Sequence, residues 1–219
     1  MSKWRYKKNS KKFTYRKRNM KLLDIVPDSI VIDILTHIEE QTQKSEKNYP
    51  CNQGDEVAIT GSLFSALKTD WINCGNWSWN IDHKISNRRA EGMFNEKETG
   101  ADGIISINIK CNDEKTYTKS ILFQAKKEGN FKGLDKQIKD MNNTLKGGNM
   151  VIIYSDRGFW AQTANEFDRK NEIKFDNYMR DVFFACQSGF WGRKTYISGN
   201  QQIRLYCLNV NIEEKSKMR

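Results

Sequence analysis

Apolar residues recur at two different spacings along the chain, and the change between them separates expected helices from expected strands. Spacings of three or four residues predict helices over 28–46, over about 54–69 and over 133–145. Asn52 is a candidate N-cap of the second of these helices. Residues 162–188 also have a mainly helical pattern. The inward stripes of the first two helices are formed by Ile30, Ile34, Leu35, Ile38, Ile59, Leu63 and Leu67.

Short runs of β-branched and aromatic residues predict the strands. The runs at 103–110 and 117–126 are separated by the polar stretch CNDEKT, and we expect them to pair as an antiparallel hairpin. A buried strand is predicted over 149–155, and one or two more over 195–212. Residues 70–100 show neither period and are expected to be irregular.

The order of these elements predicts the fold class. Helix, helix, hairpin, helix, strand, helix and strands is the pattern of an α/β fold, with a central mixed β-sheet flanked by helices. The chain has 219 residues, which is enough for one substantial domain, and it contains no internal repeat or low-complexity linker. We therefore expect a single domain over 22–219, preceded by a tail over 1–21.

The excess positive charge is concentrated in this tail. Ten of the 37 lysine and arginine residues lie within residues 1–21, which contain no acidic residue, and the other 27 are balanced by 27 acidic residues. Aromatic residues are interleaved with these cations, as in segments that bind phosphates and stack on bases. We expect a flexible arm that contacts nucleic acid, although a solvated extension with no specific partner has the same composition. The cations assigned to this contact are Lys7, Lys8, Lys11, Lys12, Arg16, Lys17 and Arg18.

Cysteine usage and hydropathy bear on the compartment of the protein. The five cysteines are odd in number and never spaced as CxxC, which argues against a disulfide framework and a zinc ribbon. This usage favours a reducing, cytoplasmic setting. The sequence has no apolar run of about eighteen residues, so no transmembrane helix is expected. The N-terminal charges are not followed by an apolar stretch, so we expect no secretory signal.

The second strand of the predicted hairpin ends in FQAKK, where polar side chains stand beside apolar ones. Gln124 and Lys126 share one face because side chains alternate along a strand. If the hairpin turns near 113–114, Asp102 lies opposite Ala125 and is flanked by Gln124 and Lys126. This register would bring a carboxylate, an amide oxygen and an ammonium group to one edge of the sheet.

A second carboxylate is expected near the same edge. Glu56 shares the inward stripe of the second predicted helix with Ile59 and Leu63. A glutamate on a core-facing stripe needs a partner, and a bound cation would serve as one. The ordinary alternative is an acid in the first helical turn, where the helix dipole favours it.

These residue types together suit phosphodiester hydrolysis. Mg²⁺ takes oxygen ligands and keeps several waters, so one or two carboxylates, an amide oxygen and a main-chain carbonyl are sufficient. Such an ion polarises a phosphate and lowers the pKa of a bound water, while a neighbouring lysine adds positive charge to the transition state. The anion that Lys126 faces would then be the scissile phosphate. The alternative is a surface hairpin whose aspartate, lysine and glutamine have no catalytic role.

GADG at 100–103 followed by FQAKK at 123–127 resembles the motif of the PD-(D/E)xK nuclease superfamily. The similarity is to the branch with QxK in the second half-motif, as in Mrr-like restriction endonucleases and nuclease effectors of prokaryotic anti-phage systems. The resemblance covers about 54–155 and implies a restriction-endonuclease-like core. That core is a helix with a glutamate, a hairpin with the aspartate and QxK, a helix and another strand. It also implies Mg²⁺ as the cofactor, for which Mn²⁺ can substitute.

The resemblance also implies roles for individual residues. Asp102 would be the main metal ligand, Gln124 a ligand in place of the usual acid, and the Ala125 carbonyl a further ligand. Lys126 would be the catalytic lysine and Glu56 the helix carboxylate. Other glutamates precede the aspartate as well, so the identity of that carboxylate stays open among Glu56, Glu91, Glu96 and Glu98.

By this resemblance we expect a DNA endonuclease of prokaryotic restriction or anti-phage defence that cuts duplex DNA. A homodimer or larger oligomer is expected because cutting both strands requires two sites, and a regulatory partner protein because an unregulated nuclease endangers its host. The alternatives are a non-catalytic nucleic-acid-binding module and a partner-docking subunit on the same fold. The further candidate nucleic-acid contacts are Gln137, Lys127, Arg193 and Lys194, the last two in a turn that ordinary packing would also explain.

Overall fold

The structure is a computed structural model, and most of the chain can be described from it. The described residues are 21–49, 55–86, 99–145, 148–168, 170–191 and 205–215. The predicted basic tail, apart from Lys21, lies outside these residues. The other predicted residues that lie outside them are Asn52, Glu91, Glu96, Glu98, Arg193 and Lys194.

Four helices and nine strands form the described part of the molecule. The helices are α1 (Asp28–Lys47), α2 (Glu56–Leu67), α4 (Leu134–Thr144) and α5 (Phe175–Tyr178), which continues as the π-helical turn Met179–Phe184. Short 3₁₀ turns cover Leu22–Asp24 and Ala164–Glu166. The strands are β1 (Thr69–Cys74), β2 (Trp77–Ser86), β3 (Gly103–Lys110), β4 (Thr116–Lys127), β5 (Met150–Ser155), β6 (Gly158–Thr163), β7 (Ile173–Lys174), β8 (Phe190–Trp191) and β9 (Leu205–Glu214).

The described strands form one mixed sheet in the order β1-β2-β9-β3-β4-β5-β6-β7, with β8 paired to β4. The hairpin β3–β4 is antiparallel, whereas β4 runs parallel to β5 and β3 runs parallel to β9. Parallel neighbours need a crossover, and α4 provides the one between β4 and β5. The α/β fold with a central mixed sheet flanked by helices is therefore confirmed.

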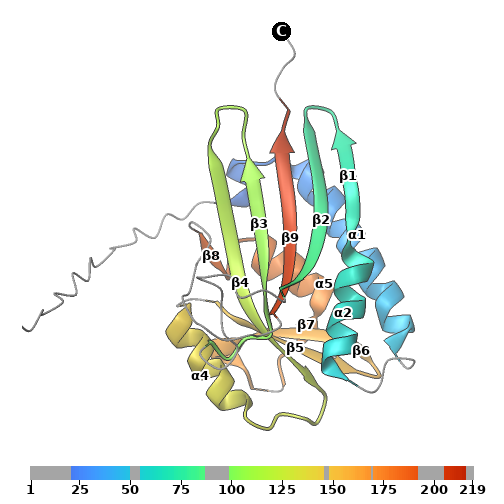
Figure 1. The fold of residues 1–219 in the computed structure, drawn as a ribbon, viewed down its shortest axis with the longest axis vertical. Helices are drawn as coiled ribbons and strands as arrows, with labels where there is room; N and C mark the ends of the chain where they lie inside the picture. The colour runs from blue at the N-terminus through green and yellow to red at the C-terminus, as the bar shows by residue number, and fades with distance from the viewer. Residues whose placement is uncertain are drawn as a thin grey trace, which may run out of the picture.

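Apolar side chains on the two faces of the sheet form separate clusters. One face packs against α1, α2 and α5 through residues such as Ile34, Phe64 and Phe123. The other face packs against α4 through a smaller cluster that includes Leu122 and Met141. Figure 1 shows α2 and α4 on either side of the lower ends of β3, β4 and β9. Those strand ends hold the predicted site.

Two of the predicted segments are wrong. Residues 70–100 were expected to be irregular, but β1 and β2 form a hairpin around a turn in which Gly75 has φ of 59°. Residues 162–188 were expected to be mainly helical, yet only 175–184 are an extended helical segment and β7 interrupts the range. Alternation was hidden in the first range because β2 pairs with β9 through polar side chains such as Asn80, and in the second because β7 has two residues and is too short to show it. The second predicted helix begins at Glu56 with Asp55 as its cap, so Asn52 is not the N-cap.

The register of the β3–β4 hairpin differs from the predicted one by one residue. Gly103 pairs with Phe123 and Lys110 with Thr116, which brings Asp102 level with Gln124 rather than Ala125. The cause lies in the loop, where Glu114 has φ of 62° and Cys111 donates its N–H to the Lys115 carbonyl. The centre of the hairpin loop therefore falls on residue 113 instead of between residues 113 and 114.

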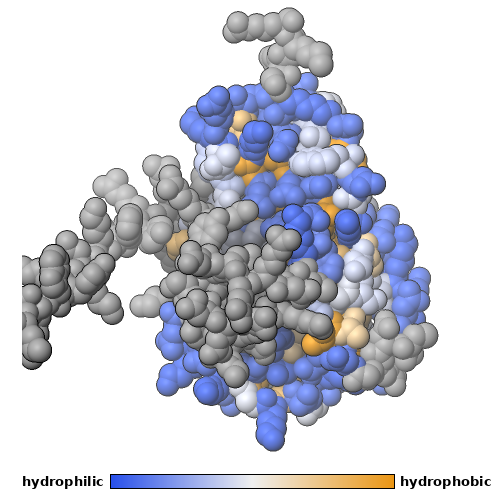
Figure 2. Space-filling view, viewed as in Figure 1, coloured by the Kyte–Doolittle hydropathy of each residue, from blue (hydrophilic) through white to orange (hydrophobic). Residues whose placement is uncertain are grey.

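A row of polar side chains crosses four strands above the site. Thr118 donates to Asn108, Asn108 to Asn211, and Asn211 to Asn80, over distances of 3.3, 3.0 and 2.9 Å. Hydrophilic residues predominate on the described surface in this region in Figure 2. The side chains of this row are hydrogen-bonded to one another, so their polar groups have partners. This explains how a sheet face without a helix above it can be polar.

Candidate functional site

The loop that precedes β3 is fixed by a close approach to α4. Gly100 has φ of 67°, and a Cβ atom there would lie 2.3 Å from the main-chain oxygen of Gln137. Ala101 donates its N–H to the hydroxyl of Thr99, which is buried. The positive φ and the close approach both require glycine at position 100, because other residues rarely adopt this φ and none has room.

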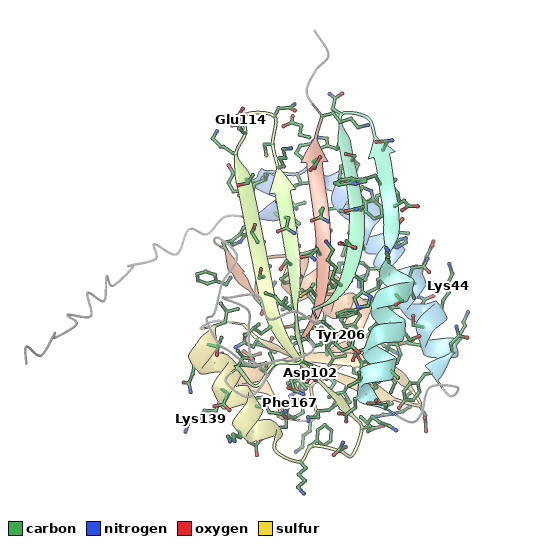
Figure 3. The ribbon with its side chains drawn as sticks, viewed as in Figure 1. Lys44, Asp102, Glu114, Lys139, Phe167 and Tyr206 are labelled. Atoms are coloured by element: carbon green, nitrogen blue, oxygen red, sulfur yellow. The ribbon has the colours of Figure 1, made fainter. Side chains whose placement is uncertain are left out.

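Gly103 fixes the other side of the same loop. A Cβ atom on Gly103 would lie 2.3 Å from the Tyr206 carbonyl oxygen and 2.5 Å from the Phe123 ring. The main chain of Asp102 is held between the same neighbours, donating to the Phe123 carbonyl at 2.9 Å and accepting from the Tyr206 N–H at 3.0 Å. Figure 3 shows Asp102 and Tyr206 together where β3, β4 and β9 converge. The two glycines of GADG thus allow close main-chain packing on both sides of Asp102, and this packing fixes where its carboxylate lies.

The Asp102 carboxylate contacts the end of β4 directly. Its Oδ2 atom accepts hydrogen bonds from the Ala125 N–H at 2.8 Å and from Gln124 Nε2 at 2.6 Å. Gln124 Nε2 also lies 3.3 Å from the Ala125 carbonyl oxygen. Asp102, Gln124 and Ala125 are therefore brought together as predicted, in spite of the shifted register.

The oxygen of the Gln124 amide has no hydrogen-bond partner among the described residues. The Gln124 side chain is 2% exposed, and this Oε1 atom is buried. An unpaired buried amide oxygen costs about 1–3 kcal/mol. Turning the amide by half a rotation would place Oε1 beside Asp102 Oδ2 and the Ala125 carbonyl. Three oxygens would then lie close together, and a hard cation that kept several waters could use them as ligands.

Lys126 lies on the same strand face as Gln124. Its neighbour on β5 is Ile153, a member of the apolar cluster under α4, and its side chain is 8% exposed. In the described ranges no hydrogen bond or ion pair joins the Lys126 ammonium to another residue. An ammonium without a paired anion is suited to form charge-assisted hydrogen bonds to an anion that arrives from outside.

Glu56 occupies a different point at the end of β4. Its Oε1 atom accepts from the Lys127 N–H and from Asn130 Nδ2, each at 2.9 Å. These bonds fasten the first residue of α2 to the strand and to the turn that follows it. Glu56 is half-buried and lies in the first turn of α2, where the helix dipole favours an acid, and one of its carboxylate oxygens holds the end of β4 and the turn after it.

The two carboxylates share an electrostatic environment. Burial raises the pKa of Tyr154, and the negative charges of Asp102 and Glu56 raise it further. The Tyr154 hydroxyl lies 2.9 Å from the hydroxyl of Thr60 on α2, and that hydrogen bond acts in the opposite direction on the pKa. Asp102 and Glu56 are thus close enough to act on one hydroxyl group, although the hydrogen bonds described above fix them to different residues.

The other predicted contacts are distributed around this edge. Gln137 lies on α4 next to Gly100, and its Oε1 atom is buried without a hydrogen-bond partner in the described part of the chain. Lys127 is half-buried and occupies the opposite strand face from Lys126.

Sequence reasoning missed Tyr206 and Asn130. Tyr206 closes the far side of the site by donating to the Val57 carbonyl at 2.7 Å and stacking on His83 with ring centroids 5.9 Å apart. Its role depends on β9 inserting between β2 and β3, which no local pattern indicates. The signal for Asn130 was available, since GN after a strand is typical of a turn whose asparagine makes local hydrogen bonds.

No family model, no curated protein and no solved structure matches the chain. No helix in the described ranges combines the length and the apolar character needed to cross a membrane. Among the same residues, no three His, Cys, Asp or Glu side chains are grouped so that they could hold a metal ion. Metal binding by the described residues would therefore depend on amide and main-chain oxygens in addition to carboxylates.

Proposed function

We propose that the protein is a metal-dependent nuclease that hydrolyses phosphodiester bonds in DNA. The observation that carries the proposal is the shared strand edge. Asp102 Oδ2 lies 2.6 Å from the Gln124 amide and 2.8 Å from the Ala125 nitrogen, and the buried Lys126 follows on the same face as Gln124. A carboxylate, an amide and a buried cation are the groups that phosphodiester hydrolysis with a divalent ion uses.

The residues present fit a hard divalent cation such as Mg²⁺, with Mn²⁺ as a substitute. Asp102, Gln124 after rotation of its amide, and the Ala125 carbonyl would hold it, and the unpaired Gln124 Oε1 supports this fit. Glu56 would contribute its second carboxylate oxygen, because Oε1 is occupied by the Lys127 N–H and Asn130. When bound, such an ion polarises a phosphate and lowers the pKa of a coordinated water.

The chain itself supplies the positioning and the charge. Lys126 would lie against a non-bridging phosphate oxygen and stabilise the negative charge that develops there, an effect that burial strengthens by excluding water. Gly100 and Gly103 let the loop carry Asp102 against β4 without intervening side chains. Gln137 on α4 and Lys127 would contact the DNA backbone, where amide N–H groups and cations bind phosphate oxygens.

The biological setting follows from the same proposal. A nuclease of this type fits prokaryotic restriction or anti-phage defence. Cutting both strands of a duplex requires two sites, so the active form would be a dimer or larger oligomer under the control of a partner protein. The basic tail would provide non-specific affinity for the DNA backbone. Sedimentation of the protein with and without a DNA duplex would test the assembly.

One observation favours a binding module without catalysis. The Oδ2 atom of Asp102 already accepts hydrogen bonds from the Gln124 amide and the Ala125 N–H, as it would in a site that no longer holds a metal. The two candidates differ in metal affinity. We expect Mn²⁺, followed by its electron paramagnetic resonance signal, to bind wild-type protein and to bind Asp102→Asn at least tenfold more weakly.

A matched control for this titration is Asp135→Asn, which removes an exposed carboxylate from the first turn of α4. We expect this control to retain wild-type affinity for Mn²⁺. Equal Mn²⁺ binding by Asp102→Asn and wild type, combined with DNA binding, would favour the module.

A further inference from the structure

Lys119 is a buried cation on the face of β4 opposite to the candidate site. It is 1% exposed, and its ammonium donates to the main-chain oxygen of Phe183 and lies 4.2 Å from the centroid of the Phe183 ring. Phe183 belongs to the last turn of the helical segment 175–184. The ammonium is therefore stabilised by the negative end of a helix and by a π face instead of by a carboxylate.

Cys186 is brought to the same carbonyl oxygen. Its main-chain N–H donates to the Phe183 oxygen at 3.2 Å, so the oxygen that accepts from Lys119 also accepts from Cys186. Cys186 has φ of 61°, and its thiol is partly exposed, 3.5 Å from the Phe184 oxygen. The Lys119 ammonium and the main-chain nitrogen of Cys186 thus meet at one oxygen, and the Cys186 side chain is itself a hydrogen-bond partner that acts to raise the pKa of Lys119.

We propose that Lys119 and Cys186 form an oxidation-dependent covalent cross-link between β4 and the turn that follows Phe184. The oxidant would be hydrogen peroxide, which transfers one oxygen to the thiol, giving a sulfenic acid and water. The Lys119 amine then attacks the sulfur, the S–O bond breaks, and the departing hydroxide leaves as water with the amine proton. The product has an S–N bond, and the net change is the loss of two hydrogens.

The surroundings of Lys119 favour the attack of its amine on the oxidised sulfur. Burial lowers the pKa of Lys119 to about 8, whereas the charge of Cys186 acts in the opposite direction. A substantial fraction of the side chain is then a neutral amine, which is the nucleophilic form. A neutral S–N bond would also remove a charge from an apolar site, where charge is costly.

The strand pairing next to the pair limits its freedom. Lys119 pairs with Trp191 and Ser120 with Phe190, so β8 holds the turn against β4. A Cβ atom on Gly189 would lie 3.1 Å from Lys119 Cε, which shows how closely the turn covers the lysine stem. The turn that follows Phe184 is therefore held against the strand that carries Lys119.

A second cysteine–lysine pair in the chain is a matched control. Cys111 and Lys115 are joined by a main-chain hydrogen bond of 2.9 Å across the β3–β4 loop. Lys115 is exposed, and its hydrogen bond and ion pair with Asp113 raise its pKa, so the amine stays protonated. We expect no cross-link there.

The test is treatment of the full-length protein with hydrogen peroxide, followed by intact-mass measurement and peptide mapping. We expect a species about 2 Da lighter than the reduced chain, with the peptides of Lys119 and Cys186 joined, and its reversal by dithiothreitol. Lys119→Met should abolish the joined peptide yet leave a sulfenic acid on Cys186 that dimedone traps. This variant keeps the reaction of the thiol, so loss of the link is not explained by loss of oxidation.

Three results would overturn the proposal. One is wild-type protein that accumulates only unlinked sulfenic or sulfinic acid on Cys186 under conditions where its circular dichroism is native. Another is a Cys111–Lys115 link formed to the same extent, since that would show non-specific chemistry of proximal pairs. Lys119→Arg provides a second variant that retains the buried cation but lacks the amine, and a link to any other lysine in it is the third result.

Discussion

Raising the pH should stabilise the fold through Lys119. Burial lowers its folded-state pKa from the ordinary 10.5 to about 8. Between these two values the unfolded chain carries the proton and the folded protein does not, so the free energy of unfolding rises with pH. The free-energy cost of burying the charged lysine is fully present below the folded-state pKa. It has disappeared above the pKa of the unfolded chain.

The magnitude follows from the size of the shift. Each unit of pKa corresponds to about 1.4 kcal/mol, so a lysine of this kind costs roughly 3 kcal/mol when it must stay charged in the fold. Between about pH 7.5 and about pH 9.5, the part of this cost that is relieved is about 2 kcal/mol. The change is large against a total stability of about 5–15 kcal/mol for a domain.

The assay is urea unfolding at these two pH values for wild type and for Lys119→Met. Methionine has a similar length and no charge, so it fills the space without the proton equilibrium. Tyrosines and cysteines with raised pKa, such as Tyr178 and Cys111, destabilise the fold at alkaline pH, but they act equally in both proteins. We expect the free energy of unfolding of wild type, relative to Lys119→Met, to rise by about 2 kcal/mol.

The reasoning fails if the two proteins respond to pH in parallel. That result would mean that Lys119 keeps an ordinary pKa, and that the Phe183 carbonyl and ring compensate fully for the removal of water from the ammonium.

Three further predictions concern the site and the tail. Gly100→Ala should destabilise the fold by about 1–3 kcal/mol more than Gly129→Ala in urea unfolding. Both glycines have positive φ, but only a Cβ atom on residue 100 would meet a main-chain oxygen, that of Gln137. Equal losses of stability would contradict the close approach of residue 100 to α4. Glu56→Gln should keep the melting temperature within a few degrees but lower any Mg²⁺-dependent cleavage rate at least tenfold, and an unchanged rate would leave Glu56 with a structural role alone. Deleting residues 1–21 should weaken DNA binding and make it less dependent on salt. The slope of log affinity against log salt concentration should become shallower by about 0.9 for each phosphate that the tail neutralises. Unchanged affinity would refute the binding of DNA by the tail.

The elements with a single clear period were predictable. The helix at Asp28–Lys47 and the strand at Met150–Ser155 match their predicted ranges within a residue or two. Each is specified by its own residues, since one apolar stripe or one continuous apolar run decides its structure. The face shared by Gln124 and Lys126 was predictable for the same reason, because alternation along a strand needs no knowledge of its neighbours.

Long-range pairing was not predictable. The strand β9 completes the sheet between β2 and β3 and supplies Tyr206 to the site, although it comes from the end of the chain. The polar alternation of β2 is intelligible only once Asn80 is seen to bond Asn211. The hairpin register depended on Glu114 adopting a left-handed conformation, which glutamate seldom does. These features are set by tertiary contacts and loop closure rather than by local preference.

The most direct test of the nuclease proposal is incubation of supercoiled plasmid with the full-length protein in Mg²⁺, in EDTA, and with Lys126→Ala in Mg²⁺. Lys139→Ala is the matched control, since it removes a lysine of α4 that lies away from the site residues. We expect nicked or linear DNA with wild type and Lys139→Ala in Mg²⁺, and intact plasmid with EDTA and with Lys126→Ala. Cleavage by Lys126→Ala at the wild-type rate, or cleavage that persists in EDTA, would contradict the proposed site.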